Sequence, residues 1–200
     1  MKKIITIILI LITYTISLGQ NQNLSQGVLY DGEPYIAVNP SNPQHMVVAW
    51  LGYKPFQYIV IKTRTTFDGG QSWSDSVNIP HTNPLYGSAD PSLAFDNTGN
   101  VFLCYIDFDV VIDSGSVYVR RSTDGGLSWE APVEVINAHS DPGKHPIDRP
   151  WISIDRSGGL YDGYIYVTTI PPNVFGPLPP PYNPYFIKST NGGSSFEPWQ

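Results

Sequence analysis

The chain has 200 residues, a net charge of −6 and 14% charged residues, and it is rich in aromatic residues, glycine and proline. A nucleic-acid partner needs a basic face, and 11 Lys and Arg against 17 Asp and Glu leave none visible. A single cysteine, Cys104, excludes a disulfide framework and a thiolate metal site. We expect it to be a buried, small apolar residue.

The amino terminus has the pattern of a signal peptide. Lys2 and Lys3 form a basic start, residues 4–18 are mostly apolar, and Ser17 and Gly19 precede a polar stretch. As a membrane span the apolar run is short and contains several hydroxyl residues. We therefore expect residues 1–20 to be a signal peptide, with export to a secreted, cell-surface or periplasmic location and no stable membrane insertion after cleavage.

Three similar units follow the signal peptide, at about residues 28–80, 81–137 and 138–200. Each begins at a proline that opens a strand-like run, and these prolines, Pro34, Pro91 and Pro150, are 57 and 59 residues apart. In the second unit the pattern predicts four strands, at 91–95, 101–106, 116–121 and 133–136. The fold class is therefore predicted to be all-β, a β-propeller of four-stranded blades with about three blades present; a β-sandwich is the alternative.

An octet recurs near the end of each unit, at 66–73, 122–129 and 189–196. It contains a hydroxyl residue, Asp or Asn, a glycine pair, and a serine before a large aromatic ring. The carboxyl or amide group can accept hydrogen bonds from backbone amides just downstream, and glycine reaches positive φ without strain. The octet is therefore predicted to be a turn that joins two strands of one sheet.

The third unit is longer than the others because of a proline-rich stretch at 171–184. We interpret it as a loop inserted between strands, since the repeat resumes after it; a linker between domains is the alternative. Aromatic side chains near this loop are candidate platforms for stacking sugars. They are Trp151, Tyr161, Tyr164, Tyr166, Phe175, Tyr182 and Tyr185.

The octet resembles the Asp box of the sialidase superfamily, also called the bacterial neuraminidase repeat. Two copies are complete, and the third has Asn191 for Asp and Phe196 for Trp. The resemblance covers residues 28–199 and implies a six-bladed or seven-bladed propeller, with each box between the third and fourth strands and away from the active site. The octet residues are therefore expected to be structural: Thr66, Asp68, Gly70, Ser72, Trp73, Ser122, Asp124, Gly126, Ser128, Trp129, Ser189, Asn191, Gly193, Ser195 and Phe196.

Three blades do not close a ring, because propellers typically have four to eight. The sequence is therefore predicted to be the amino-terminal portion of a longer protein, association of half-rings being the alternative. The first arginine of the sialidase family lies in an Arg-Ile-Pro motif, but here Gly32 occupies that position before Glu33 and Pro34. This difference puts activity on sialic acid in doubt.

Two functions remain open at this stage. The first is a secreted module that binds an extracellular glycan or protein. The alternative is a glycoside hydrolase of sialidase-like type that uses carboxylates near the propeller channel. The fold alone does not choose between them.

The candidate site residues are the charged groups beside the unit-starting prolines, namely Glu33, Asp90, Asp148 and Arg149. If the first strands are innermost, these side chains border the central channel. Asp148 and Arg149 would then belong to a ligand-binding or catalytic face, with Asp90 and Glu33 across from them. The alternative is that these groups recur because they hold one blade to the next by hydrogen bonds.

No cofactor or metal is expected. Asp107, Asp109 and Asp113 have oxygen ligands that calcium could use, but their spacing matches no calcium loop, and a solvated hairpin is favoured. The four histidines show no zinc-site spacing and are expected at the surface. They are His45, His81, His139 and His145.

Overall fold

The computed structural model of the protein describes residues 21–27, 29–53, 58–111, 113–172, 180 and 184–200. The predicted signal peptide and most of the proline-rich stretch, with Phe175 and Tyr182, lie outside these residues. Every regular element of the described chain is a β-strand. In that same part of the chain, no helix has the length and apolar character needed to span a bilayer.

The strands form three consecutive antiparallel sheets, each following the order of the chain. The first blade is β1 (Asp31–Val38), β2 (Met46–Gly52), β3 (Val60–Thr66) and β4 (Val77–Asn78). The second blade is β5 (Gly87–Phe95), β6 (Val101–Phe108), β7 (Gly115–Ser122) and β8 (Val133–Asn137). The third blade is β9 (Asp148–Ile154), β10 (Ile165–Ile170) and β11 (Tyr185–Ser189). The predicted all-β fold of propeller blades is confirmed.

The last residues run along β11 where β4 and β8 run in the other blades. The amide of Glu197 donates to the carbonyl of Lys188, and Phe186 and Gln200 exchange two backbone hydrogen bonds. Trp199 packs edge-on against Tyr185, with ring centroids 5.1 Å apart. These contacts give the third blade the beginning of a fourth strand.

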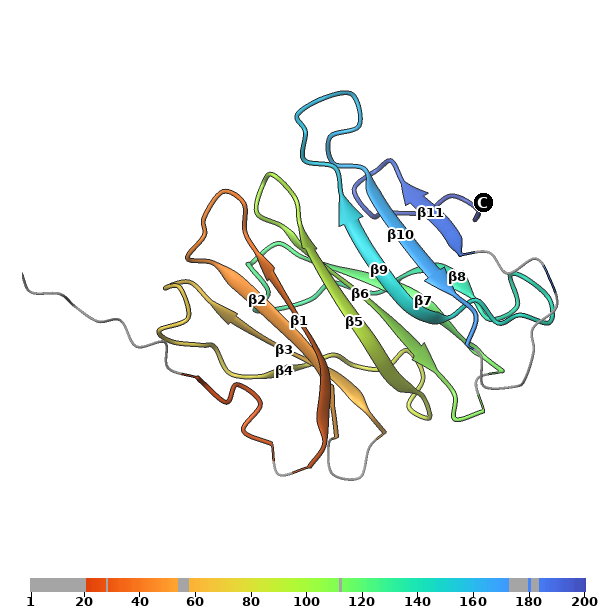
Figure 1. The fold of residues 1–200 in the computed structure, drawn as a ribbon, viewed down its shortest axis with the longest axis horizontal. Helices are drawn as coiled ribbons and strands as arrows, with labels where there is room; N and C mark the ends of the chain where they lie inside the picture. Colours follow the sequence, from red (N-terminus) through yellow and green to blue (C-terminus); the bar gives the residue numbers. More distant parts are fainter. Residues whose placement is uncertain (1–20, 28, 54–57, 112, 173–179, 181–183) are drawn as a thin grey trace, which may run out of the picture.

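The blades pack face to face, and their first strands lie side by side (Figure 1). Alternate residues of each strand point to opposite faces of its sheet, so both faces of the second blade are apolar. One core joins the first and second blades, with Val47 and Ile61 packed near Leu103 and Tyr105. A second core joins the second and third blades and contains the fully buried Cys104, whose thiol pKa is raised by that burial. This packing brings β1, β5 and β9 to one side of the molecule.

The octets form tight turns after β3, β7 and β11. In the second copy, the Asp124 carboxylate accepts hydrogen bonds from the hydroxyls of Ser122 and Ser128 and from the amides of Leu127 and Ser128. Gly126 has a φ of 93°, and a Cβ there would lie 2.6 Å from Thr65 Oγ1 of the first blade. The glycine therefore permits both the turn and the close approach to the neighbouring blade.

The first and third octets have the same arrangement. Hydrogen bonds from Ser72 lower the pKa of Asp68 to about 2. In the third copy the Asn191 oxygen accepts from Ser189 Oγ (2.8 Å) and the Ser195 amide (3.1 Å), while its amide nitrogen donates to Ser195 Oγ (2.8 Å). Asparagine therefore fits the turn, because the serine hydroxyl can act as acceptor as well as donor.

Replacing Asp124 with alanine is expected to destabilise the protein by about 1–2 kcal/mol, because it removes a carboxylate that organises one turn. Asp124→Asn is expected to retain most of the stability, as the asparagine of the third octet indicates. Urea denaturation of both variants measures this difference. Equal losses for the two variants would show that the turn does not depend on the oxygen acceptor.

Candidate functional site

The first strand of each blade carries a bulge beside its proline. Glu33, Asp90 and Arg149 have φ values of 51°, 53° and 48°, a left-handed conformation that is uncommon for residues other than glycine. The strand registers shift at the same level, between Gly32 and Tyr35 and between Ala89 and Ser92. Bulges of this kind redirect a side chain and often occur next to functional sites.

The bulge residues are linked from one blade to the next. The amide of Asp90 donates to Glu33 Oε2 at 3.1 Å, and the amide of Arg149 donates to Asp90 Oδ2 at 3.1 Å. The candidate residues therefore lie in a row on neighbouring strands, rather than facing each other across a channel. The two acidic side chains do form blade-to-blade hydrogen bonds, as the structural alternative predicts.

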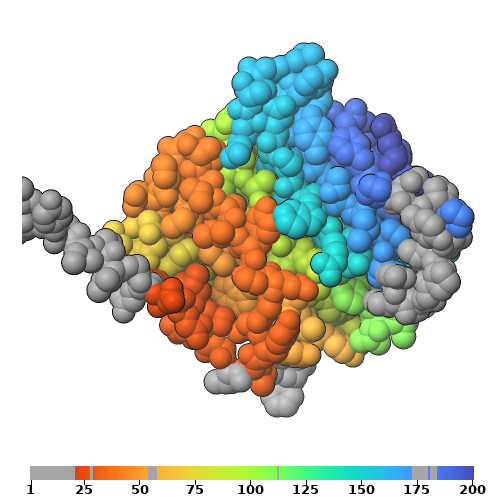
Figure 2. Space-filling view, in the orientation of Figure 1, coloured from red at the N-terminus to blue at the C-terminus, as the bar shows by residue number. Residues whose placement is uncertain are grey.

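A hollow of about 190 Å³ opens over this row. It is lined by each bulge residue, its proline and the residue after the proline: Glu33, Pro34, Tyr35, Asp90, Pro91, Ser92, Arg149, Pro150 and Trp151. In Figure 2 the segments that form it, coloured orange, green and cyan, meet near the middle of the visible face. The hollow combines two carboxylates, a guanidinium and two aromatic rings.

The two aromatic rings of the hollow contact each other. Trp151 is 60% exposed, and its ring meets Tyr35 edge-on with centroids 5.7 Å apart. Tyr35 was not among the sequence candidates, although it follows Pro34 as Trp151 follows Pro150. The other proposed aromatic platforms within the described chain lie elsewhere: Tyr161 packs on Tyr164, and Tyr166 on Phe186.

Two carboxyl groups, those of Glu33 and Asp148, hold their protons unusually tightly. Burial, together with the neighbouring Asp90, raises the pKa of Glu33 to about 7. Burial also raises the pKa of Asp148 to about 6, again with a contribution from Asp90. Arg149 opposes both shifts because its positive charge favours the ionised acids. Asp90 is therefore the charge that couples the two flanking acids.

The raised pKa of Glu33 predicts a loss of stability as the pH rises. A group whose pKa is higher in the folded state stabilises that state below the unfolded pKa and stops doing so above the folded one. For Glu33 this window runs from pH 4.5 to about 7. Compared with the wild type, Glu33→Gln is expected to show a smaller fall in Tm between about pH 5 and about pH 8, measured by thermal denaturation. Asp75→Asn, at an exposed carboxylate outside the row, serves as the control and should leave the fall unchanged.

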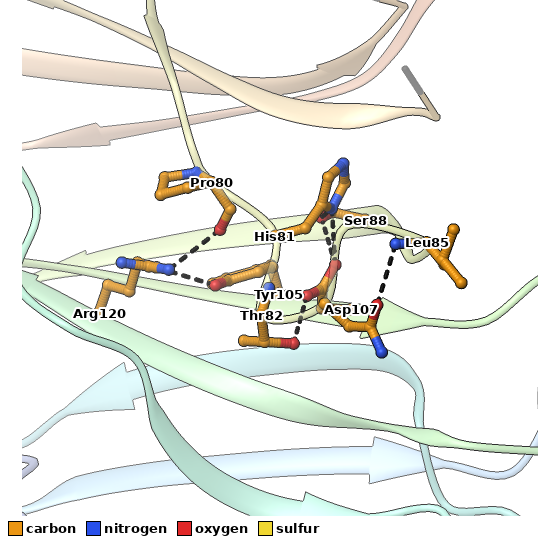
Figure 3. Close-up of polar contacts among 9 residues, drawn as sticks. Pro80, His81, Thr82, Leu85, Ser88, Tyr105, Asp107 and Arg120 are labelled. Carbon is orange, nitrogen blue, oxygen red and sulfur yellow. Dashed lines mark hydrogen bonds and ion pairs between the residues drawn. The ribbon is translucent and has the colours of Figure 1, made fainter. Parts of the chain in front are cut away.

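A second cluster of polar side chains surrounds Asp107 inside the molecule (Figure 3). Asp107 is 0% exposed and lies 2.6 Å from both the amide and the hydroxyl of Thr82, 2.8 Å from Ser88 Oγ and 2.9 Å from His81 Nδ1. Thr82 and His81 belong to the segment that connects the first blade to the second. The cluster therefore fixes this connection and was not predicted from the sequence.

The three aspartates considered for calcium do not share a site. Asp107 bonds to the buried cluster, whereas Asp109 accepts from the Asp113 amide (3.1 Å) and from Ser114 Oγ (3.3 Å) in the β6–β7 turn. Within the described ranges, no group of three or more His, Cys, Asp or Glu side chains could hold a metal ion.

Two histidines expected at the surface have structural contacts. His45 is buried, stacks on Phe67 and lies 2.9 Å from the carbonyl of Gly125 in the next blade. His81 takes part in the Asp107 cluster. For these two, the surface expectation was wrong, because contacts between blades are not visible in the local sequence.

Comparison with known proteins identifies the fold. No family model matches the sequence, and neither does any curated protein. A protein of unknown function from Dyadobacter fermentans is similar in structure, with a TM-score of 0.60 and 15% identity over 86% of this chain and 54% of that one. The endo-arabinase from Bacteroides thetaiotaomicron has a TM-score of 0.55 and 17% identity over 82% and 60% of the two chains.

The α-L-arabinanase from Penicillium chrysogenum, solved in complex with arabinobiose, is also similar, with a TM-score of 0.55 and 16% identity over 86% of this chain and 45% of that one. The chain therefore spans about half the length of these structures. The glycoside hydrolase propellers among the matches have five blades, fewer than the six or seven that the sialidase resemblance implies. At this level of identity the similarity establishes part of a β-propeller fold.

Proposed function

We propose that the protein is an exported propeller that binds an extracellular glycan in the hollow over the bulges of β1, β5 and β9. The observation that carries the proposal is the exposed ring of Trp151, which shares one hollow with Glu33, Asp90 and Arg149. An aromatic ring offers an apolar face for stacking a sugar, and the charged groups beside it can bind hydroxyls. Ligand-binding sites commonly combine apolar walls with a few polar groups in this way.

Three further features support the proposal. The fold is shared with arabinanases, one of them solved with arabinobiose. Arg149 forms no ion pair within the described part of the chain, so its guanidinium remains open to a ligand. The predicted signal peptide would bring the protein to extracellular glycans. On this proposal the octets are Asp boxes that shape the blades and take no part in binding.

Titration calorimetry of the full-length protein with arabino-, β-1,3-galacto- and sialyl-oligosaccharides tests the proposal. Trp151→Ala is expected to weaken binding of the preferred saccharide roughly tenfold, because it removes the stacking surface. Tyr161→Ala, at an exposed aromatic of the β9–β10 hairpin, is the matched control and should bind as the wild type does. If no saccharide of the panel binds, or if both variants bind equally, the proposal fails.

A second candidate function is glycoside hydrolysis in the same hollow. The observation that favours it is the raised pKa of Glu33, which lines the hollow, because a glycosidase needs one carboxyl group that still holds its proton near neutral pH. A sialidase-type reaction is less well supported, since glycine replaces arginine at position 32. Release of reducing sugar from the same oligosaccharides distinguishes a hydrolase from a binding module.

A further inference from the structure

The residues that directly follow the three bulge prolines occupy equivalent positions but differ in size. They are Tyr35 in the first blade, Ser92 in the second and Trp151 in the third. Each lies two residues after the residue of its strand that has a positive φ. Two of the three are large aromatic residues, so the serine of the second blade is the exception in the repeat.

In the first blade, the aromatic side chain at this position occupies the boundary with the second blade. Tyr35 pairs with Ala49 within its own sheet, and its side chain packs against the core that the first two blades share. That core includes Leu93 of β5 and Leu103 of β6. Tyr35 therefore points toward the next blade and takes up space between β1 and β5, just beyond the bulges.

The serine of the second blade points toward the next blade in the same way, but it leaves the corresponding space open. Ser92 Oγ donates to the Pro150 carbonyl of the third blade at 3.0 Å. Ser92 is 2% exposed, so its small side chain lies in the floor of the hollow of about 190 Å³ that it lines. The hollow thus lies where the first blade has a tyrosine ring.

Two aromatic rings border this space from opposite sides. Tyr35 reaches it from the first blade and Trp151 from the third, and the two rings meet edge-on with centroids 5.7 Å apart. Because the second blade lies between those two blades, the rings meet in front of β5, at the level of Ser92. A tyrosine at position 92 would have to share the space with both rings.

The size of the hollow fits one ring of a ligand. Its volume of about 190 Å³ is below the range of about 300–1,000 Å³ that is usual for pockets that take drug-sized ligands. In the first blade, the equivalent space takes the side chain of one tyrosine. A second hollow of about 260 Å³ lies further along the same strands, and Tyr35 lines both hollows. Tyr35 therefore lies where the two hollows adjoin.

We propose that Ser92 determines the specificity of the hollow, because it opens a space that takes the terminal ring of a glycan in place of an aromatic side chain. This inference rests on the proposed function and adds the class of ligand to it. The terminal ring stacks against the aromatic rings of Tyr35 and Trp151, and the following rings of the glycan lie outside the hollow. Ser92 contributes by its small size, since its hydroxyl proton is already donated to Pro150.

The dependence of binding on chain length tests this inference without any substitution. Titration calorimetry of the full-length protein compares di- and tetrasaccharides of the arabino-, β-1,3-galacto- and sialyl-series. For the series that binds, the Kd should differ by less than about threefold between the two lengths. A larger difference would show that further rings are bound, for example in the hollow beyond Tyr35, and would overturn the inference while the proposed function stands. If no series binds, both fail.

Substitution of Ser92 tests its role directly. Ser92→Tyr restores the aromatic residue of the repeat and should weaken binding at least about tenfold, because its ring occupies the hollow. Ser76→Tyr is the matched control and should bind as the wild type does. It adds the same side chain at an exposed serine just before β4, on the outer edge of the first blade.

Two further variants separate size from folding and from the hydroxyl group. Thermal denaturation shows whether Ser92→Tyr folds; if it does not, Ser92→Val replaces it, with a weakening of at least about threefold expected. Ser92→Ala removes the hydrogen bond to Pro150 without filling the hollow, so it should lose much less affinity than the larger side chains. A folded larger variant that binds as tightly as the wild type, or an equal loss in Ser92→Ala, would overturn the inference.

Discussion

Replacing Asp107 with alanine is expected to destabilise the protein by about 3 kcal/mol, the largest stability effect predicted for a single side chain in this structure. The carboxylate is completely buried and is the shared acceptor for the Thr82 amide, the Thr82 hydroxyl and the Ser88 hydroxyl. Alanine would remove the acceptor that these donors share and leave an unfilled space around it. Of the donors, Ser88 is buried and would keep only His81 Nδ1 as a neighbour, whereas Thr82 is exposed and can bond to water. Losing a fully buried carboxylate with its hydrogen bonds costs more than losing a surface hydrogen bond, because the buried part of the network cannot reach water.

The effect of Asp107→Ala should be measured by urea denaturation, with Asp75→Ala as the control. Asp75 is an exposed aspartate whose replacement should change the free energy of unfolding by less than about 0.5 kcal/mol. Because the cluster fixes the connection between the first two blades, hydrogen exchange in residues 80–88 should also increase in the alanine variant. A loss no larger than that of the control would show that the cluster does not hold the connection.

The sequence predicted the blades well because their signals are local. In the second blade, the expected strands at 101–106, 116–121 and 133–136 lie within β6, β7 and β8. The first strand was expected at 91–95, but β5 begins at Gly87, because the strand continues through the bulge at Asp90. A bulge interrupts the alternation of residues from which a strand is predicted. The predicted strand therefore ends at the bulge, although β5 continues beyond it.

The candidate site was only partly predictable. The proline spacing indicated that Glu33, Asp90 and Arg149 would lie at the same height along the first strands of their blades. The hydrogen bonds that link them from strand to strand agree with this prediction. The sequence did not reveal the Asp107 cluster, because Thr82 and Asp107 are 25 residues apart and meet only when β5 and β6 pair. Contacts of this kind depend on which strands become neighbours, and that information is not contained in one segment.

Two arginines, Arg64 and Arg120, show the same limit of local sequence information. Each lies two residues before an octet, which is visible in the sequence. The sequence does not show that Arg120 Nε donates to the Tyr105 hydroxyl, whereas Arg64 Nε is buried without a hydrogen-bond partner among the described residues. Arg120 has acceptors because the first blade packs against the second and because Tyr105 carries a hydroxyl. The structure thus separates two residues that the repeat alone treats as equivalent.

Asp90→Asn is expected to shift the titration of the whole acidic row, with the largest effect on function. The substitution removes the negative charge that raises the pKa of both Glu33 and Asp148, but it keeps an oxygen to accept the Arg149 amide. Both pKa values should therefore fall toward 4.5 and 3.8, their ordinary values. In consequence, the fall in Tm from about pH 5 to about pH 8 should be smaller than in the wild type, whereas Asp75→Asn should leave it unchanged.

This variant also distinguishes the two candidate functions. If Glu33 donates a proton during hydrolysis, its protonated fraction near pH 7 should fall below the present value of about one half, so hydrolysis should slow and its pH optimum should become more acidic. Burial, which the substitution leaves in place, keeps part of the pKa shift. If the hollow only binds neutral glycans, the affinity near pH 7 should change by no more than a few-fold. The asparagine side chain can still form hydrogen bonds, so it partly replaces the carboxylate. An unchanged pH dependence of both Tm and function would show that Asp90 does not couple the two acids.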